Sequence, residues 1–188
     1  LERHVQKHLL KFLEDHNLFY PFQSGFRHKH SCQSALIRLC DSLLSSINND
    51  EVCGAVFLDF KKAFDLVNHS ILLQKLALYV RHTPTIDFFQ SYLDKRKQRV
   101  LVNGCYSQEG TVKCGVPQGS ILGPILFGIF INDLPFNITN NTVSCDMFAD
   151  DNSLHTSAKD IPTVQNALQE SLNDVSHWCQ NNQMLLHP

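Results

Sequence analysis

Two adjacent carboxylates, Asp150 and Asp151, are the residues whose type and spacing most directly predict chemistry. Apolar and polar residues alternate at 143–147, and a second strand-like run follows at 152–155, so the pair is predicted at a hairpin tip. A turn can aim two successive side chains at one volume. Two negative charges in one volume raise a carboxylate's pKa unless cations neutralise them, and Mg²⁺ prefers oxygen ligands. The pair therefore predicts a divalent-metal site, with an acidic turn in water as the alternative.

A third carboxylate, Asp59, stands near the end of a predicted buried strand over residues 52–60. This run is apolar at odd and even positions until Asp59, which is typical of a strand covered on both faces. A charge in such a place is costly unless it is paired or binds something. Asp59 is therefore a candidate ligand, and the alternative is a helix cap or an ion pair with Lys61 or Lys62.

A glycine-flanked segment, residues 115–120 with the sequence Gly-Val-Pro-Gln-Gly-Ser, precedes a predicted apolar helix over 121–134. Glycines allow the backbone to approach a ligand closely, and the start of a helix offers free N–H groups to a phosphate. We interpret the segment as a candidate substrate loop, with a plain turn as the alternative.

The elements that must position these residues are helices and strands interleaved along the chain. Helical spacing predicts a helix from Ser31 to Ile47 with one apolar stripe, Leu36, Leu39, Cys40, Leu43 and Ile47. Further helices are predicted over 1–14, 84–93, from a cap at Ser70 to about 80, and from a cap at Asp160 to about 179, with Trp178 in the core. A hairpin over 99–108, with a type I′ turn at Asn103-Gly104, is followed by a predicted strand at 111–114.

The composition describes a globular chain of 188 residues with 43% hydrophobic content, enough for one domain or one and a half. No apolar run approaches the ~20 residues of a membrane-spanning helix. The net charge of −2 argues against a freestanding nucleic-acid binder, although basic clusters at 27–29, 61–62 and 95–99 could contact phosphate or simply be solvated. Seven cysteines without a Cys-x-x-Cys pair predict buried, reduced thiols in an intracellular protein that is not secreted.

Four stretches together resemble the reverse transcriptase domain of non-LTR (LINE-type) retrotransposons. Gln23-Ser24-Gly25-Phe26-Arg27 looks like that family's fingers motif, and residues 57–65, Phe-Leu-Asp-Phe-Lys-Lys-Ala-Phe-Asp, are similar to its first catalytic motif. Residues 115–124 match its substrate-pocket motif, and Phe148-Ala149-Asp150-Asp151 is a variant of the Tyr/Phe-x-Asp-Asp box. The order and spacing agree along essentially the whole chain. Asn152 departs from the threonine that is usual there.

This resemblance implies an α+β fold, the right-hand polymerase palm, in which an antiparallel sheet is backed by helices. Residues 1–50 would be part of the fingers and 51–188 mainly palm, with the thumb absent and the domain truncated at both ends. We therefore expect the isolated piece to be weakly active or inactive.

The resemblance also implies an RNA-directed DNA polymerase that joins dNTPs to a primer 3′-hydroxyl, with an RNA template and a DNA primer. Asp59, Asp150 and Asp151 would hold two Mg²⁺ ions, with Mn²⁺ as a possible substitute. Arg27 would steady the template or the triphosphate. The nucleotide would be bound by Phe60, Ala63, Phe64, Gln118 and Gly119, with Phe64 excluding a 2′-hydroxyl. Asp65 is interpreted as a helix cap or turn residue rather than a ligand.

Other classes of function stay open on the sequence. One is an inactive transposon-derived remnant, and another is a nucleic-acid-binding module that keeps the palm surface without catalysis. A divalent-metal phosphatase or nuclease is a third class, although hydrolysis needs no pocket such as residues 115–120. A nuclear or cytoplasmic location without membrane association is expected.

Overall fold

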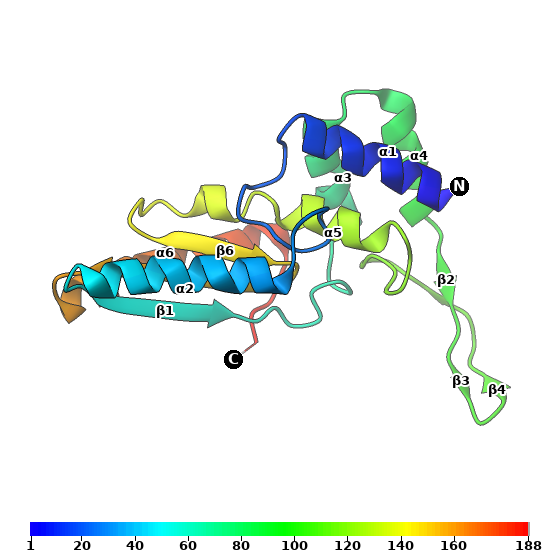
Figure 1. Ribbon diagram of the computed structural model, residues 1–188. Coiled ribbons are helices and arrows are strands. Elements are labelled where there is room, and N and C mark those ends of the chain that lie inside the picture. The colour runs from blue at the N-terminus through cyan, green and yellow to red at the C-terminus, as the bar shows by residue number, and fades with distance from the viewer. Residues whose placement is uncertain (188) are drawn as a thin grey trace.

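A three-stranded antiparallel sheet organises the computed structural model, which describes residues 1–187. The strands are β1 (Val52–Leu58), β6 (Ser144–Phe148) and β7 (Asp151–Ala158), in the order β1-β7-β6. β7 therefore pairs with β1 along one edge and with β6 along the other. Helices pack around this sheet (Figure 1), which confirms the predicted α+β class.

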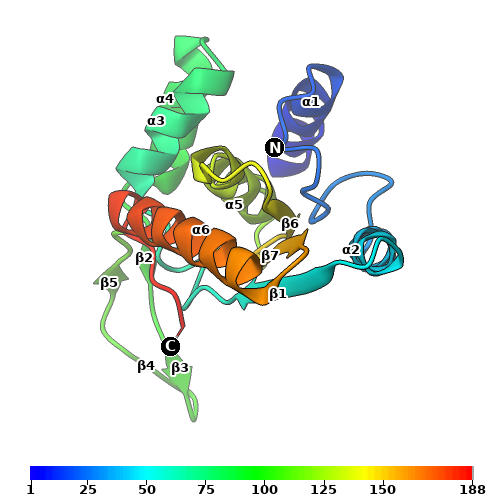
Figure 2. The ribbon, with the colours of Figure 1, turned by 90° about the vertical axis from the view of Figure 1, so that its left-hand side faces the viewer.

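Two helices cover the opposite faces of the sheet. α6 (Ile161–Asn182) packs on β7 and β1, where Gly54 faces Val164 and Leu168 of the helix. The neighbouring Cys53 contacts the backbone of α2 (Cys32–Asn48) through its thiol. Successive residues of a strand point to opposite faces, so α6 lies on one face and α2 on the other (Figure 2).

The core continues into a helical layer around α5 (Gly123–Ile131). Eight of its nine residues are buried, as expected for a helix that is apolar all round. α3 (His69–Tyr79) packs on both α5 and α4 (Thr83–Leu93). α1 (Glu2–Asp15) and the short 3₁₀ helix η1 (Pro135–Asn137) complete this part of the chain (Figure 2).

A two-stranded arm projects from this body (Figure 1). Its stem pairs β2 (Lys97–Gln98) with β5 (Gly110–Thr111), and its tip pairs β3 (Leu101–Val102) with β4 (Cys105–Tyr106). Positive φ angles at Asn103 and Gly104 fit the predicted type I′ turn. The strand predicted at 111–114 is wrong, because the pairing ends at Thr111.

The sequence prediction for α2 is also wrong in one respect. None of its residues is buried, and Leu36 and Ile47 are 58% and 56% exposed. The helix contacts the sheet through Arg38, Ser42 and Leu43, so much of its apolar stripe faces solvent.

The predicted buried cysteines are corrected in the same way. All seven are free thiols, but only Cys145 and Cys179 are buried. The other five lie on α2, on β1, on the arm or in the loop after it, and they are exposed or only partly buried.

Local signals at the helix ends were mostly informative. Asp160 caps α6 by accepting a hydrogen bond from the Thr163 amide, as predicted. Asn68, rather than Ser70, caps α3. Trp178 is buried, as expected of a core residue.

Among residues 1–187, no helix combines the length and apolarity that crossing a membrane would need.

Candidate active site

The fold brings the three predicted carboxylates to one end of the sheet. β1 ends at Leu58, which pairs with Asn152 of β7, so Asp59 follows beside the β6–β7 hairpin. Phe148 pairs with Asp151 and closes that hairpin around Ala149 and Asp150. Asp150 and Asp151 therefore stand at a hairpin tip, as predicted, with Asp59 at the adjacent strand end.

The negative charges of Asp59 and Asp151 affect the pKa of Asp150. Burial, and then the charges of Asp151 and Asp59, raise the pKa of Asp150, against a hydrogen bond from its own backbone that lowers it. None of the three forms a salt bridge with a Lys, Arg or His within residues 1–187. The predicted alternative, an ion pair of Asp59 with Lys61 or Lys62, is therefore not formed.

The chemistry of this donor set fits a hard divalent cation, which takes carboxylate oxygens and relieves crowded negative charge. The side chains are not gathered around a ready site, because no group of three His, Cys, Asp or Glu in the described chain is close enough to hold an ion. The assignment of the three aspartates as ligands stays a prediction.

A small cleft of about 330 Å³ adjoins these acids on the α2 side of the sheet. Asp59 and Asp151 contribute to its wall, together with apolar side chains of α2 and β1, including Leu36, Leu39 and Phe57. The exposed ring of Phe57 and the exposed Leu36 thus stand beside the carboxylates.

Asp146, a third acid on the same hairpin, has a cationic partner. Asp146 is buried, and its Oδ1 lies 2.6 Å from Nε of Arg38 on α2. Its Oδ2 lies 3.3 Å from Nδ1 of His155, but burial lowers the pKa of that ring, so Arg38 is the permanently charged partner. Residues 38 and 146 are far apart in the chain, and the sequence analysis missed this pair.

The glycine-flanked segment docks on the end of the first catalytic motif. The Gly115 and Val116 amides donate to the Val67 and Phe64 carbonyls, at 2.7 and 2.8 Å. Gly115 has φ +90°, and a Cβ there would lie 2.7 Å from the Asp65 carbonyl oxygen, so this close approach requires glycine. The loop is consequently fixed against residues 64–67.

This docking places the Gln118 side chain within hydrogen-bond distance of Asp65. Its Nε2 donates to Oδ1 of Asp65 at 3.1 Å, so Asp65 orients a predicted nucleotide-binding residue. Gln118 and Gly119 are both exposed, which leaves them accessible to a ligand.

The other predicted nucleotide-binding residues divide into two groups. Phe60 and Ala63 are buried, and Phe60 packs against Trp178. Phe64 is half-buried, stacks on Phe127 with ring centroids 4.4 Å apart, and meets Phe26 edge-on. Of these three residues, Phe64 keeps part of its side chain in reach of a ligand.

Arg27 is engaged within its own loop. Its guanidinium donates to the Tyr20 and Gln23 carbonyls and stacks over Phe19. Burial lowers its pKa, while the charge of Glu14 raises it. Its predicted role toward template or triphosphate is not tested by these contacts.

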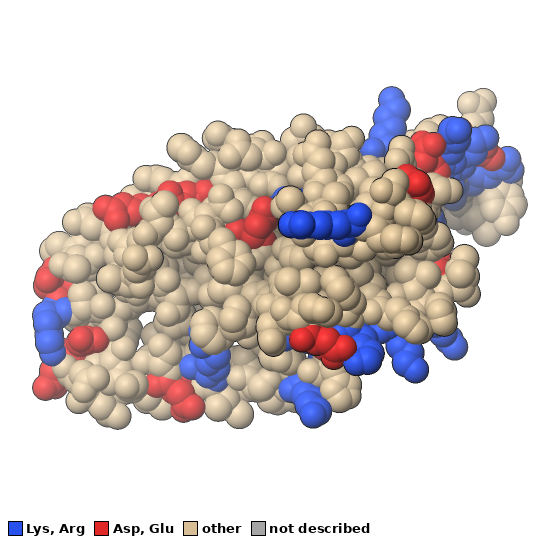
Figure 3. Space-filling view, turned by 90° about the horizontal axis from the view of Figure 1, so that it is seen from above, with Lys and Arg blue, Asp and Glu red and all other residues tan. Residues whose placement is uncertain are grey.

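A basic cleft of about 760 Å³ lies beside Gln118, between the arm and the loop. Four cations and one acid line it: Lys62, Arg96, Lys97, Lys113 and Asp65. Lys97 pairs with Glu109, whereas Lys62 and Lys113 have no salt bridge within the described chain. Viewed from above, Lys and Arg side chains lie mainly toward the right-hand half of the molecule (Figure 3).

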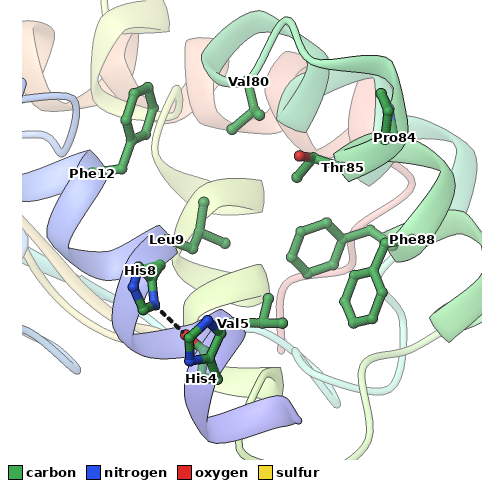
Figure 4. A pocket seen from close by; sticks show the side chains of 10 residues that line it. His4, Val5, His8, Leu9, Phe12, Val80, Pro84, Thr85 and Phe88 are labelled. Atoms are coloured by element: carbon green, nitrogen blue, oxygen red, sulfur yellow. Dashed lines mark hydrogen bonds between the residues drawn. The ribbon is translucent and has the colours of Figure 1, made fainter.

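An apolar pocket of about 390 Å³ is separate from these features (Figure 4). It lies between α1 and α4, and its walls include Val5, Leu9, Phe12 and Phe88. No predicted site residue lines it.

The antiparallel sheet backed by helices agrees with the palm fold that the resemblance implied. Residues 1–188 match the reverse transcriptase (RNA-dependent DNA polymerase) family, and the chain belongs to that family. The resemblance inferred from the four motifs is thereby confirmed.

Relatives include the probable RNA-directed DNA polymerase from transposon BS of Drosophila melanogaster, 32% identical over 95% of this chain. The RNA-directed DNA polymerase from mobile element jockey of Drosophila funebris is 33% identical, also over 95%. The chain spans about a fifth of the length of either relative, 20% of each. Apo telomerase from Candida tropicalis, truncated of its C-terminal domain, superposes with a TM-score of 0.67 over 99% of this chain and 38% of its own, at 17% identity. At that identity the likeness shows the fold alone.

Proposed function

We propose that this chain is the palm, with part of the fingers, of an RNA-directed DNA polymerase from a non-LTR retrotransposon. Its reaction would join a dNTP to the 3′-hydroxyl of a DNA primer on an RNA template. The observation that carries the proposal is that Asp59 and the Asp150-Asp151 tip lie at the same end of the sheet, unpaired by any cation of the described residues, in a chain of this family.

Asp59, Asp150 and Asp151 would hold two Mg²⁺ ions, or Mn²⁺ in their place. When bound, such ions lower the pKa of the primer hydroxyl and neutralise charge on the triphosphate and the leaving pyrophosphate. The protein's own contribution is then chiefly positioning, because in-line phosphoryl transfer needs the attacking and leaving oxygens aligned about the phosphorus.

The surrounding residues supply that positioning. Gln118, oriented by Asp65, would meet the incoming nucleotide. The basic cleft beside it would take polynucleotide phosphates, which dominate the affinity of such proteins. The cleft compensates locally for the net charge of −2.

Primer extension by the full-length protein tests this proposal. With an RNA template, a DNA primer, dNTPs and Mg²⁺, we expect Asp150→Asn to lose at least about a hundredfold in rate, because metal ligands contribute several kcal/mol and each 1.36 kcal/mol is tenfold. Asp87→Asn, at an exposed position of α4, is the matched control. Full activity of Asp150→Asn would refute the proposal, and template binding without extension by the parent would favour the nucleic-acid-binding alternative.

Phe64 gives a second test of the same function. If its ring excludes a 2′-hydroxyl, Phe64→Ala should incorporate ribonucleotides more readily while keeping much of its deoxyribonucleotide activity, because the change removes a clash. The stack on Phe127 predicts some loss of stability as well. Equal discrimination in the variant and the parent would assign Phe64 to packing.

A further inference from the structure

The backbone of the carboxylate hairpin is strained at its tip. Ala149 has φ +60°, a left-handed conformation that is uncommon for a residue with a Cβ. Of the two tip residues, Ala149 and Asp150, Ala149 alone has a positive φ, a conformation that glycine takes without steric cost. Such a conformation is unfavourable for alanine and persists only where the surroundings fix it.

Gln23 provides that fixation from outside the hairpin. Its side chain is 1% exposed, and its Oε1 accepts hydrogen bonds from the Ala149 amide at 3.1 Å and from the Gly25 amide at 2.7 Å. One oxygen therefore joins the Gly25 amide of its own loop to the amide of Ala149, the residue immediately before Asp150.

The rest of the loop follows the hairpin closely. The Met147 amide donates to the Phe22 carbonyl at 3.1 Å, and the Ser24 amide donates to the Met147 carbonyl at 2.8 Å. A Cβ on Gly25 would lie 2.3 Å from the Ala149 nitrogen. Residues 22–25 thus form a short parallel bridge along the last residues of β6, and glycine is needed at position 25 for the approach.

We propose that Gln23 is a positioning residue, which fixes the strained Ala149 peptide and thereby the directions of the Asp150 and Asp151 side chains. The proposal rests on the proposed function for its effect on catalysis, since it assigns Gln23 to the same site. It gives part of the fingers motif a role on the hairpin itself, distinct from contact with template or triphosphate.

The experiment compares three variants in the full-length protein. Gln23→Met keeps the length of the side chain but has no oxygen acceptor. Gln23→Glu keeps a carbonyl acceptor and replaces Nε2, which is buried without a partner among the described residues, with a hydroxyl, because burial beside other carboxylates favours the protonated form of the new acid. Asn132→Leu is the matched control, because Asn132 is a buried amide that binds the Leu18 carbonyl and the Tyr20 amide without touching the hairpin.

Amide exchange at Ala149 is the direct readout, and it does not depend on the polymerase activity. After correction for overall stability, we expect exchange to be at least about tenfold faster in Gln23→Met, because the hydrogen bond that protects the amide is gone. Protection should be retained in Gln23→Glu and in Asn132→Leu. Unchanged exchange in Gln23→Met, or equal loss of protection in Gln23→Glu, would overturn the proposal.

Steady-state kinetics then test positioning against a merely structural role. We expect kcat to fall about 10- to 100-fold in Gln23→Met, since small misplacements of reacting groups have effects of that size, with KM for the dNTP nearly unchanged. Asn132→Leu, measured below its melting temperature, should keep kcat. An equal fall of kcat in Asn132→Leu would overturn the proposal, whereas retained activity of Asp150→Asn would refute the proposed function and leave the exchange result standing.

Discussion

Asp146 and Asp150 lie four residues apart on one hairpin, and their electrostatic surroundings are opposite. Asp146 is buried and paired with Arg38 at 2.6 Å, whereas Asp150 has no cationic partner among the described residues and shares its surroundings with Asp151 and Asp59, whose charges add to burial in raising its pKa. A paired acid fixes one element against another. An unpaired acid among other acids destabilises the fold unless something external binds it, so the comparison separates a structural acid from a candidate functional one.

The largest effect expected on stability comes from breaking the pair. Arg38→Met leaves the buried Asp146 carboxylate without its charged partner and beside the His155 ring, 3.3 Å from Oδ2. We expect β6 and β7 to open more easily by about 3 kcal/mol, because Arg38 is partly exposed and the low end of the range for a broken buried pair applies. Amide-exchange protection of β6 and β7 in the full-length protein measures this free energy.

A double variant sharpens the same result. Arg38→Met with Asp146→Leu removes both charges, and such replacements are often neutral, so we expect most of the loss to be recovered. Additive losses in the double variant would show that the two side chains do not act as a pair.

The comparison extends to cations. Lys75 is buried and paired with Asp133 at 2.6 Å, whereas Lys62 and Lys113 line the basic cleft without a salt bridge among residues 1–187. The logarithm of the affinity for nucleic acid falls linearly with the logarithm of the salt concentration. If the unpaired lysines contact phosphate, replacing both by Gln should make this negative slope shallower by about two, one for each lost contact. Filter binding of an RNA–DNA primer-template measures the slope.

The control removes the same charge elsewhere. Arg3→Gln with Lys7→Gln takes two exposed cations from α1, and its slope should stay near that of the parent. Equal slopes for the two double variants would show that the cleft is not the phosphate site.

The smallest effect concerns the stability of the metal-free protein. The pKa of Asp150 is raised above its ordinary 3.8, so the folded state binds the proton more tightly and loses stability as pH rises through the folded pKa. An asparagine at this position does not titrate, so Asp150→Asn should be more stable than the parent at neutral pH, by less than about 1 kcal/mol because the group is partly solvated. With a chelator present, this difference should shrink as the pH falls through the folded pKa and disappear well below the ordinary pKa of the carboxyl. A less stable Asp150→Asn at pH 7 would contradict the sign.

The sequence predicted the parts of this site that depend on local pattern. Alternation around residues 143–155 and the apolar run before Asp59 placed all three acids at strand ends, because strand periodicity is local. Contacts that span the chain carry no such signal. Arg38 and Asp146 are 108 residues apart, and Gln23 and Ala149 are 126 apart, so the ion pair and the contact of Gln23 with the hairpin emerged only from the structure.

The exposed face of α2 was missed for a related reason. An amphipathic stripe predicts that a helix has an apolar side, but only the packing decides what covers that side. Here the polar residues Arg38 and Ser42 make the contacts with β6 and β7, and Leu36 and Ile47 remain exposed.

Mn²⁺ binding by the full-length protein, followed by electron paramagnetic resonance, tests the central claim most directly. The variants Asp150→Asn and Asp146→Asn make the same chemical change four residues apart. We expect Asp150→Asn to weaken Mn²⁺ binding at least about tenfold, since even changes beyond the ligands cost 10–100-fold, and Asp146→Asn to bind as the parent does once its stability is matched. Mn²⁺ binding that is unchanged in Asp150→Asn would contradict the assignment of this hairpin as the metal site.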